Sequence, residues 1–174
     1  MEGVSCGRKV GKYLLYVAEI ILGLLWQVTP YGLPEVFGGK AVILVPLAVS
    51  FAMVEKEIPA MLLAVACGWL TDSTYSGAIG FYVILLVLVC FGVSVSCQHY
   101  IRRNWLTVLL LGLVTIPPIF VLHFLFYYIL PGYEEGGYLF VRHYLARIVY
   151  TLTFLPLCYS VNRMIALRIG TLRR

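Results

Sequence analysis

Residues 105–130 read WLTVLLLGLVTIPPIFVLHFLFYYIL, a run without a lysine, arginine, aspartate or glutamate. A membrane-spanning helix needs about 20 consecutive apolar residues, so this run is long enough to cross a bilayer. The whole chain has the same character: of its 174 residues 61% are hydrophobic and 12% are charged, and its mean hydropathy is +0.93. Such a chain has too few polar side chains to cover a water-facing globule. The composition indicates an all-α integral membrane protein and excludes a disordered chain, a coiled coil and a nucleic-acid-binding module.

Outward from this run, the apolar stretches predict six transmembrane helices in a single domain that covers residues 1–174. The expected spans are about 13–28, 36–54, 58–71, 78–96, 105–130 and 144–167. The second and third are the weakest, because Glu55, Lys56 and Glu57 divide them into short pieces. Two short spans or one buried hairpin fit this region. Two crossings are favoured, because a hairpin would put three charges near the bilayer centre at a cost of several kcal/mol.

The basic residues predict the orientation of these spans. With the N-terminus in the cytoplasm, ten lysines and arginines fall inside and three fall outside, as the positive-inside rule requires. The three outer ones are Lys40, Arg142 and Arg147. Both termini are then expected in the cytoplasm. The first apolar run resembles a signal peptide, but no A-x-A-like cleavage site follows it, so a retained span is expected.

The third run carries a stripe of small residues. Ala60, Ala64, Gly68 and Asp72 are four residues apart and therefore lie on one face of a helix. Small residues at this spacing let a second membrane helix approach closely. Asp72 opens a turn that leads to the next span. Its carboxylate is expected either to accept hydrogen bonds from free backbone amides there or to pair with Arg147 at a matching depth.

Other polar residues lie within the apolar runs. Glu19 in the first span is a candidate for intramembrane chemistry or for structural pairing, with Arg163 of the last span as its expected partner. His123 is expected to form hydrogen bonds rather than to bind a metal. The cysteines form no C-x-x-C pair and are expected to be small apolar packing residues.

Sequence signals of catalysis are missing. The chain contains no Walker loop, no H-E-x-x-H and no G-x-S-x-G. No two acidic residues share a helical spacing within one span, which disfavours a metal-dependent intramembrane enzyme. We therefore expect a non-enzymatic protein without a cofactor or a metal.

One segment points to a family. Gly68-Trp69-Leu70-Thr71-Asp72, followed by Gly77-Ala78-Ile79-Gly80, resembles the G-x-x-x-D…G-x-x-G segment of the rod shape-determining protein MreD. The chain length, the several short spans and the run Leu155–Arg163 agree with that family. The specific residues are confined to about 60–85 and the last span. Gly77 and Gly80 would open the fourth helix.

The resemblance implies a function and a fold. It implies a component of the cell-elongation machinery in the bacterial inner membrane, a scaffold for rod shape and peptidoglycan synthesis. Such a protein would lie among membrane lipids and bind the single-span protein MreC, and it would work with MreB, RodA and penicillin-binding protein 2. Helix packing would provide the binding. The Ala60/Ala64/Gly68 stripe is expected either to form part of the docking surface or to pack inside the chain.

A second family gives the alternative function. MreD-like proteins are similar in fold to the six-helix substrate-binding subunits of energy-coupling-factor vitamin transporters. A vitamin-carrier subunit is therefore the alternative. The A-x-x-x-A motif usual near the start of such subunits is absent from residues 13–28.

Overall fold

The computed structural model describes residues 6–29, 40–75, 80–99, 105–129 and 144–169. These residues are 94% helical and contain no strand. The elements are α1 (Cys6–Val28), α2 (Leu44–Val54), α3 (Glu57–Tyr75), α4 (Phe81–His99), α5 (Trp105–Phe124), the π-helical turn η1 (Leu125–Ile129) and α7 (Leu145–Ile169). The expected all-α architecture is confirmed for this part of the chain.

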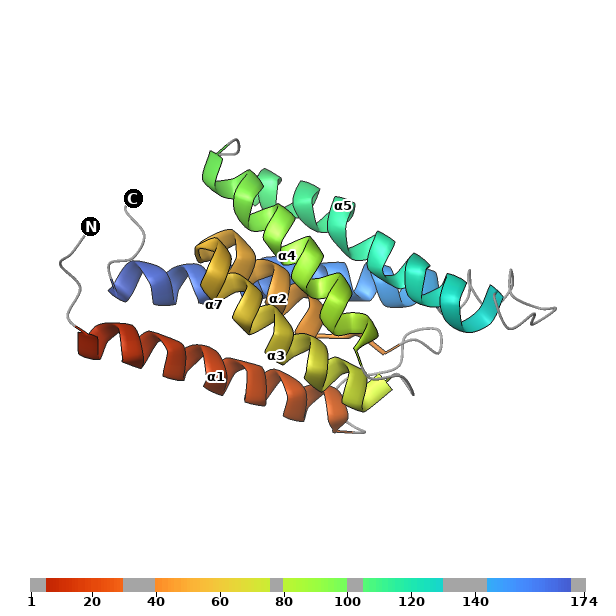
Figure 1. Ribbon diagram of the computed structural model, residues 1–174, viewed down its shortest axis with the longest axis horizontal. Coiled ribbons are helices and arrows are strands. Elements are labelled where there is room, and N and C mark those ends of the chain that lie inside the picture. Colours follow the sequence, from red (N-terminus) through yellow and green to blue (C-terminus); the bar gives the residue numbers. More distant parts are fainter. Residues whose placement is uncertain (1–5, 30–39, 76–79, 100–104, 130–143, 170–174) are drawn as a thin grey trace.

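The helix α2 forms the centre of the bundle (Figure 1). It contacts α1, α3, α4, α5 and α7, and all of its 11 residues are buried. Its sequence, LVPLAVSFAMV, is apolar around the whole circumference, which is typical of a helix enclosed by others. At 1.5 Å per residue it is about 16 Å long, much shorter than the hydrocarbon core of a bilayer.

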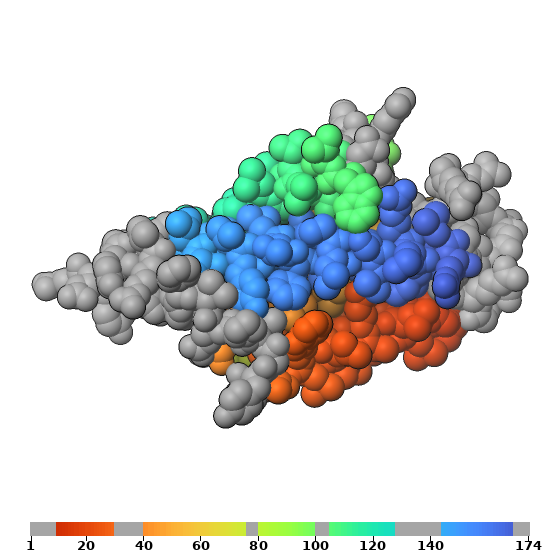
Figure 2. Space-filling view, turned by 180° about the vertical axis from the view of Figure 1, so that it is seen from behind, coloured from red at the N-terminus to blue at the C-terminus, as the bar shows by residue number. Residues whose placement is uncertain are grey.

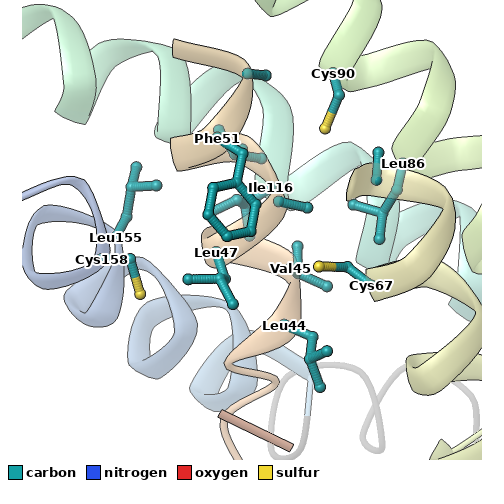
Figure 3. Close-up of a cluster of buried hydrophobic side chains, with 14 of the residues drawn as sticks. Leu44, Val45, Leu47, Phe51, Cys67, Leu86, Cys90, Ile116, Leu155 and Cys158 are labelled. Carbon is teal, nitrogen blue, oxygen red and sulfur yellow. The ribbon is translucent and has the colours of Figure 1, made fainter. Parts of the chain in front are cut away.

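The other helices surround α2 and supply the rest of the core. Figure 2 shows α7 between α1 and α5 on one face of the molecule. In the core, Phe51 and Leu47 of α2 lie among side chains from four helices (Figure 3). These side chains are Cys67 of α3, Leu86 and Cys90 of α4, Ile116 of α5, and Leu155 and Cys158 of α7. Cys67, Cys90, Cys97 and Cys158 are buried free thiols, which confirms the packing role expected for these four cysteines.

Within the described residues, four helices are long and apolar enough to cross a membrane: Val10–Val28, Phe81–His99, Trp105–Tyr127 and Leu145–Arg168. The expected second span, 36–54, is shorter in the structure, because α2 begins at Leu44 and residues 36–39 lie outside the described part. In place of the expected third span, 58–71, the structure has the longer helix α3 from Glu57 to Tyr75, which is not among these four. The described part of the chain thus has four candidate spans around the short buried helix α2, as in a multi-pass membrane protein.

The surface of the bundle is apolar, whereas several polar side chains are buried. On α3, for example, Ile58, Leu62 and Trp69 are 73%, 67% and 61% exposed. Lys12, Glu55, Asp72 and Asn162 are all less than 9% exposed. Water would make this distribution unfavourable, but hydrocarbon favours it, because lipid solvates apolar side chains and cannot hydrogen-bond polar ones.

The central position of α2 predicts which apolar residues matter for stability. Phe51 is fully buried, so Phe51→Ala should lower the free energy of unfolding in detergent by about 3–5 kcal/mol through loss of contacts and the cavity left behind. Leu110 on α5 is 62% exposed, and Leu110→Ala should change stability by less than about 0.5 kcal/mol. Equal losses in the two variants would contradict the central placement of α2.

Candidate functional site

The small-residue stripe of α3 is packed inside the bundle, and Gly68 in it lies against α4. Ala60, Ala64 and Asp72 are fully buried, and Gly68 is buried between them. A Cβ added at Gly68 would lie 2.6 Å from the Cα of Val83, a distance that real Cβ atoms do not reach. Glycine is therefore required here for the α4 backbone to come this close. Of the two roles expected for this stripe, a docking surface for a partner or packing inside the chain, the burial of its residues fits the second.

Asp72 caps the start of α4 from the preceding helix. Its carboxylate accepts hydrogen bonds from the amides of Gly80 (2.9 Å), Tyr82 (3.0 Å) and Val83 (3.3 Å). The first amides of a helix lack intrahelical partners, so these bonds satisfy donors that would otherwise be buried in apolar surroundings. Gly80 has a φ of +110°, which favours glycine at this entry to α4. Gly77 lies outside the described residues.

Arg147 does not form the ion pair with Asp72 that the sequence left open. Its guanidinium carbon lies 5.4 Å from the ring centre of Tyr75 and 5.8 Å from that of Tyr144. Both distances are within the range of cation–π interactions. The first alternative for Asp72, hydrogen bonds to backbone amides, is the one that the structure forms.

The expected pair between Glu19 and Arg163 is not formed either. The Oε2 atom of Glu19 is shielded from solvent and has no hydrogen-bond partner among the described residues. Arg163 is partly exposed on α7.

An ion pair that the sequence did not predict joins α1 to the turn between α2 and α3. The Nζ atom of Lys12 lies 2.6 Å and 2.8 Å from the two carboxylate oxygens of Glu55. The Tyr16 hydroxyl donates to the same carboxylate at 2.9 Å, and Ser94 of α4 donates to the Glu55 carbonyl at 3.2 Å. Lys12 and Glu55 are 4% and 6% exposed, so the pair is buried.

The missed signal was the spacing within α1. Lys12 and Tyr16 are one helical turn apart and lie on one face, where they can hold one acceptor together. In the sequence, Lys12 by itself indicates only orientation, and Glu55 reads as part of a charged loop. A chain in lipid has to pair its buried charges internally. A lysine in an apolar helix, such as Lys12, therefore indicates a carboxylate partner elsewhere in the chain, such as Glu55.

Further buried polar side chains form hydrogen bonds between α2 or the residues just before it and the neighbouring helices. The amide of Asn162 on α7 donates to the Ser50 hydroxyl at 2.6 Å. Near the start of α2, the backbone amide of Leu44 donates to Gln27 and that of Val42 donates to Thr151, both at 3.3 Å. Hydrogen bonds of this kind between membrane helices contribute about 0.6–2 kcal/mol each.

The described residues contain no group of three His, Cys, Asp or Glu side chains that could hold a metal ion. The Nδ1 atom of His123 lies 3.0 Å from the Tyr144 hydroxyl, so the hydrogen-bonding role expected for this histidine is confirmed. A groove of about 350 Å³ between α1 and α7 has almost entirely apolar walls, formed by Leu15, Val161, Met164, Ile165 and Arg168.

No protein family, curated protein or solved structure matches this chain.

The hydrogen bonds of Asp72 predict a loss of stability when its carboxylate is removed. Asp72→Ala leaves three amides at the start of α4 without this acceptor, one of them buried and two part-buried, and should lower the free energy of unfolding in detergent by about 2 kcal/mol. Asp72→Asn keeps one side-chain carbonyl and should lose less. Hydrogen exchange should quicken at the amides of Tyr82 and Val83. Wild-type stability with wild-type protection of these amides would contradict the capping role.

The buried ion pair predicts a rescue by a second substitution. Lys12→Met leaves the Glu55 carboxylate buried without its cation and should destabilise the protein by about 3–5 kcal/mol. Lys12→Met combined with Glu55→Leu removes both charges and should recover most of that loss. Unfolding of both variants in the same detergent measures the difference. A double variant no more stable than Lys12→Met would show that the unpaired charge is not the cause.

Proposed function

We propose that this protein is a non-catalytic membrane scaffold of the bacterial cell-elongation machinery that binds a single-span, MreC-like protein by helix packing. The proposal rests on the resemblance of residues 68–80 and of the last span to MreD. It is supported by the parts that those motif residues play in the fold. Gly68 permits the close contact of α3 with α4, and Asp72 and Gly80 build the start of α4.

The observation that carries the proposal is an open apolar face on α4. Ile84, Leu88 and Phe91 are 64%, 63% and 46% exposed on the side of α4 that points away from α3. Gly92 lies on the same face, and a Cβ built on it would meet no atom within 4 Å. An exposed glycine next to large apolar side chains lets the backbone of another membrane helix approach closely.

Contacts with α3 hold the helix that carries this face in position. The inner side of α4 packs along α3, and the Asp72 carboxylate anchors its first turn. A partner helix that docks on the outer side would therefore meet a preformed surface. Because α4 is already held in place, it would lose little conformational freedom on binding. The exposed face of α4 replaces the buried stripe of α3 as the proposed binding surface.

The proposal includes the place of the protein in the cell. It lies in the bacterial cytoplasmic membrane with both termini inside, as the distribution of lysine and arginine favours. RodA and penicillin-binding protein 2 are the further partners that this machinery implies. The beginning of α1 and the end of α7 lie at the same end of the bundle (Figure 1), which is compatible with this orientation.

The open face predicts a variant that folds but does not bind. Gly92→Leu should leave stability in detergent unchanged, because the added side chain points into open space. It should reduce co-purification with the MreC-like protein of the same organism at least about tenfold, since it prevents close helix approach. Co-expression followed by affinity purification of the tagged partner measures the effect.

Gly11→Leu is the matched control. Gly11 on α1 is also surrounded by open space, so this variant should fold and should bind the partner as the wild type does. Wild-type binding by Gly92→Leu would reject the α4 surface. Failure of the wild-type protein itself to co-purify would reject the scaffold function.

A further inference from the structure

Near the end of the bundle where α3 ends and α4 begins, three polar atoms are shielded from solvent and have no hydrogen-bond partner among the described residues. They are the Tyr82 hydroxyl on α4, the Nε2 atom of His123 on α5 and the Nε atom of Arg147 on α7. Tyr82 is fully buried and His123 is 7% exposed. We call these three side chains the donor cluster. Orphaned buried polar groups are rare in folded proteins, so three in one place require an explanation.

The donor cluster is a single packed unit. The rings of Tyr82 and His123 have their centres 5.2 Å apart, and Tyr127 stacks on His123 at 4.5 Å. The Tyr144 hydroxyl lies 3.0 Å from the Nδ1 atom of His123, and the guanidinium carbon of Arg147 lies 5.8 Å from the Tyr144 ring. Consecutive contacts therefore connect all three orphaned groups, although they come from three different helices.

All three unpaired atoms can act as hydrogen-bond donors. An arginine guanidinium can only donate, and a tyrosine hydroxyl can donate to any acceptor. When the Tyr144 hydroxyl donates to Nδ1 of a neutral His123, the hydrogen of the imidazole is on Nε2, which then becomes the third donor. What the cluster lacks is an acceptor, and with Arg147 present an anionic acceptor fits best.

The Asp72 carboxylate, which accepts from the backbone amide of Tyr82, is not that acceptor. Asp72 directs its oxygens to the amides of Gly80, Tyr82 and Val83 at the start of α4. The positive charge of Arg147 faces the rings of Tyr75 and Tyr144 instead. The aromatic walls would also exclude water from a bound group and so strengthen each hydrogen bond to it.

We propose that the donor cluster binds an oxyanion, a carboxylate or phosphate group that enters from this end of the bundle. Arg147 and Tyr82 donate to the oxyanion, and His123, oriented by Tyr144, donates through Nε2. The site is separate from the α4 face that would dock a partner helix, and it does not depend on the scaffold function.

The test uses the full chain in a neutral maltoside detergent at constant ionic strength set with NaCl. The first two probes are inorganic phosphate and succinate, titrated while thermal unfolding is recorded. The third is phosphatidylglycerol in mixed micelles, with diacylglycerol as the matched lipid that lacks the phosphate. Saturable stabilisation by at least one of the three probes, beyond that of NaCl or diacylglycerol, is the expected result.

Two variants connect the stabilisation to the donor cluster. Tyr82→Phe removes one buried hydroxyl that has no partner in the described structure, so stability without the anion should not fall, and Kd should rise about tenfold. Arg147→Gln removes the charge and should raise Kd at least about tenfold. Tyr16→Phe is the control, because its hydroxyl donates to Glu55 outside the cluster. It should lower stability and leave Kd unchanged.

The outcomes separate the sources of the oxyanion. Stabilisation by phosphatidylglycerol alone identifies a lipid headgroup, and stabilisation by phosphate or succinate identifies a soluble ligand. No stabilisation of the folded wild-type protein by any probe would overturn the proposal and leave bound water as the partner of the three donors. Equal Kd values for the wild type, Tyr82→Phe and Arg147→Gln would overturn it as well.

Discussion

The short helix α2 ends inside the bundle, and its backbone groups there have to find hydrogen-bond partners without water. Side chains of the surrounding helices provide them. Gln27 and Thr151 accept from the amides of Leu44 and Val42 near its start, and Ser94 donates to the Glu55 carbonyl beyond its end. Unsatisfied backbone groups cost several kcal/mol in hydrocarbon, so α2 is stable only while α1, α4 and α7 stay in place around it.

This constraint gives the inside and the outside of the bundle different roles. Polar contacts inside, including the Lys12–Glu55 pair and the Asn162–Ser50 bond, hold the helices in one arrangement. The outward faces are then free to meet lipid or another helix. On α4 the two sides differ most clearly, because the side toward α3 is fully occupied and the side with Leu88 and Gly92 is open. The proposed scaffold function uses this open side, whereas the donor cluster near the start of α4 is suited to a small charged group.

Parts of the candidate site could be predicted from residue type and spacing. The stripe Ala60/Ala64/Gly68 indicated a close helix contact, and the place of Asp72 before a turn indicated a role as acceptor for free amides. Both were local patterns. The partner of the stripe could not be predicted, because any neighbouring helix, in this chain or another, could have filled it. The same uncertainty gave Glu19 and Arg147 partners that the structure does not form, since matching depth does not show which helix faces meet.

The sequence by itself determined that this protein lies in lipid and that it is helical. Long apolar runs favour lipid, where the backbone groups of each run have to hydrogen-bond to one another. The sequence also determined where a helix needs glycine or an acceptor at its start. Only the tertiary structure decided that α2 is enclosed, that Lys12 pairs with Glu55 across 43 positions, and that Tyr82, His123 and Arg147 come together. These features depend on how helices far apart in the chain pack against each other, and apolar patterns that look alike on every helix do not specify their neighbours.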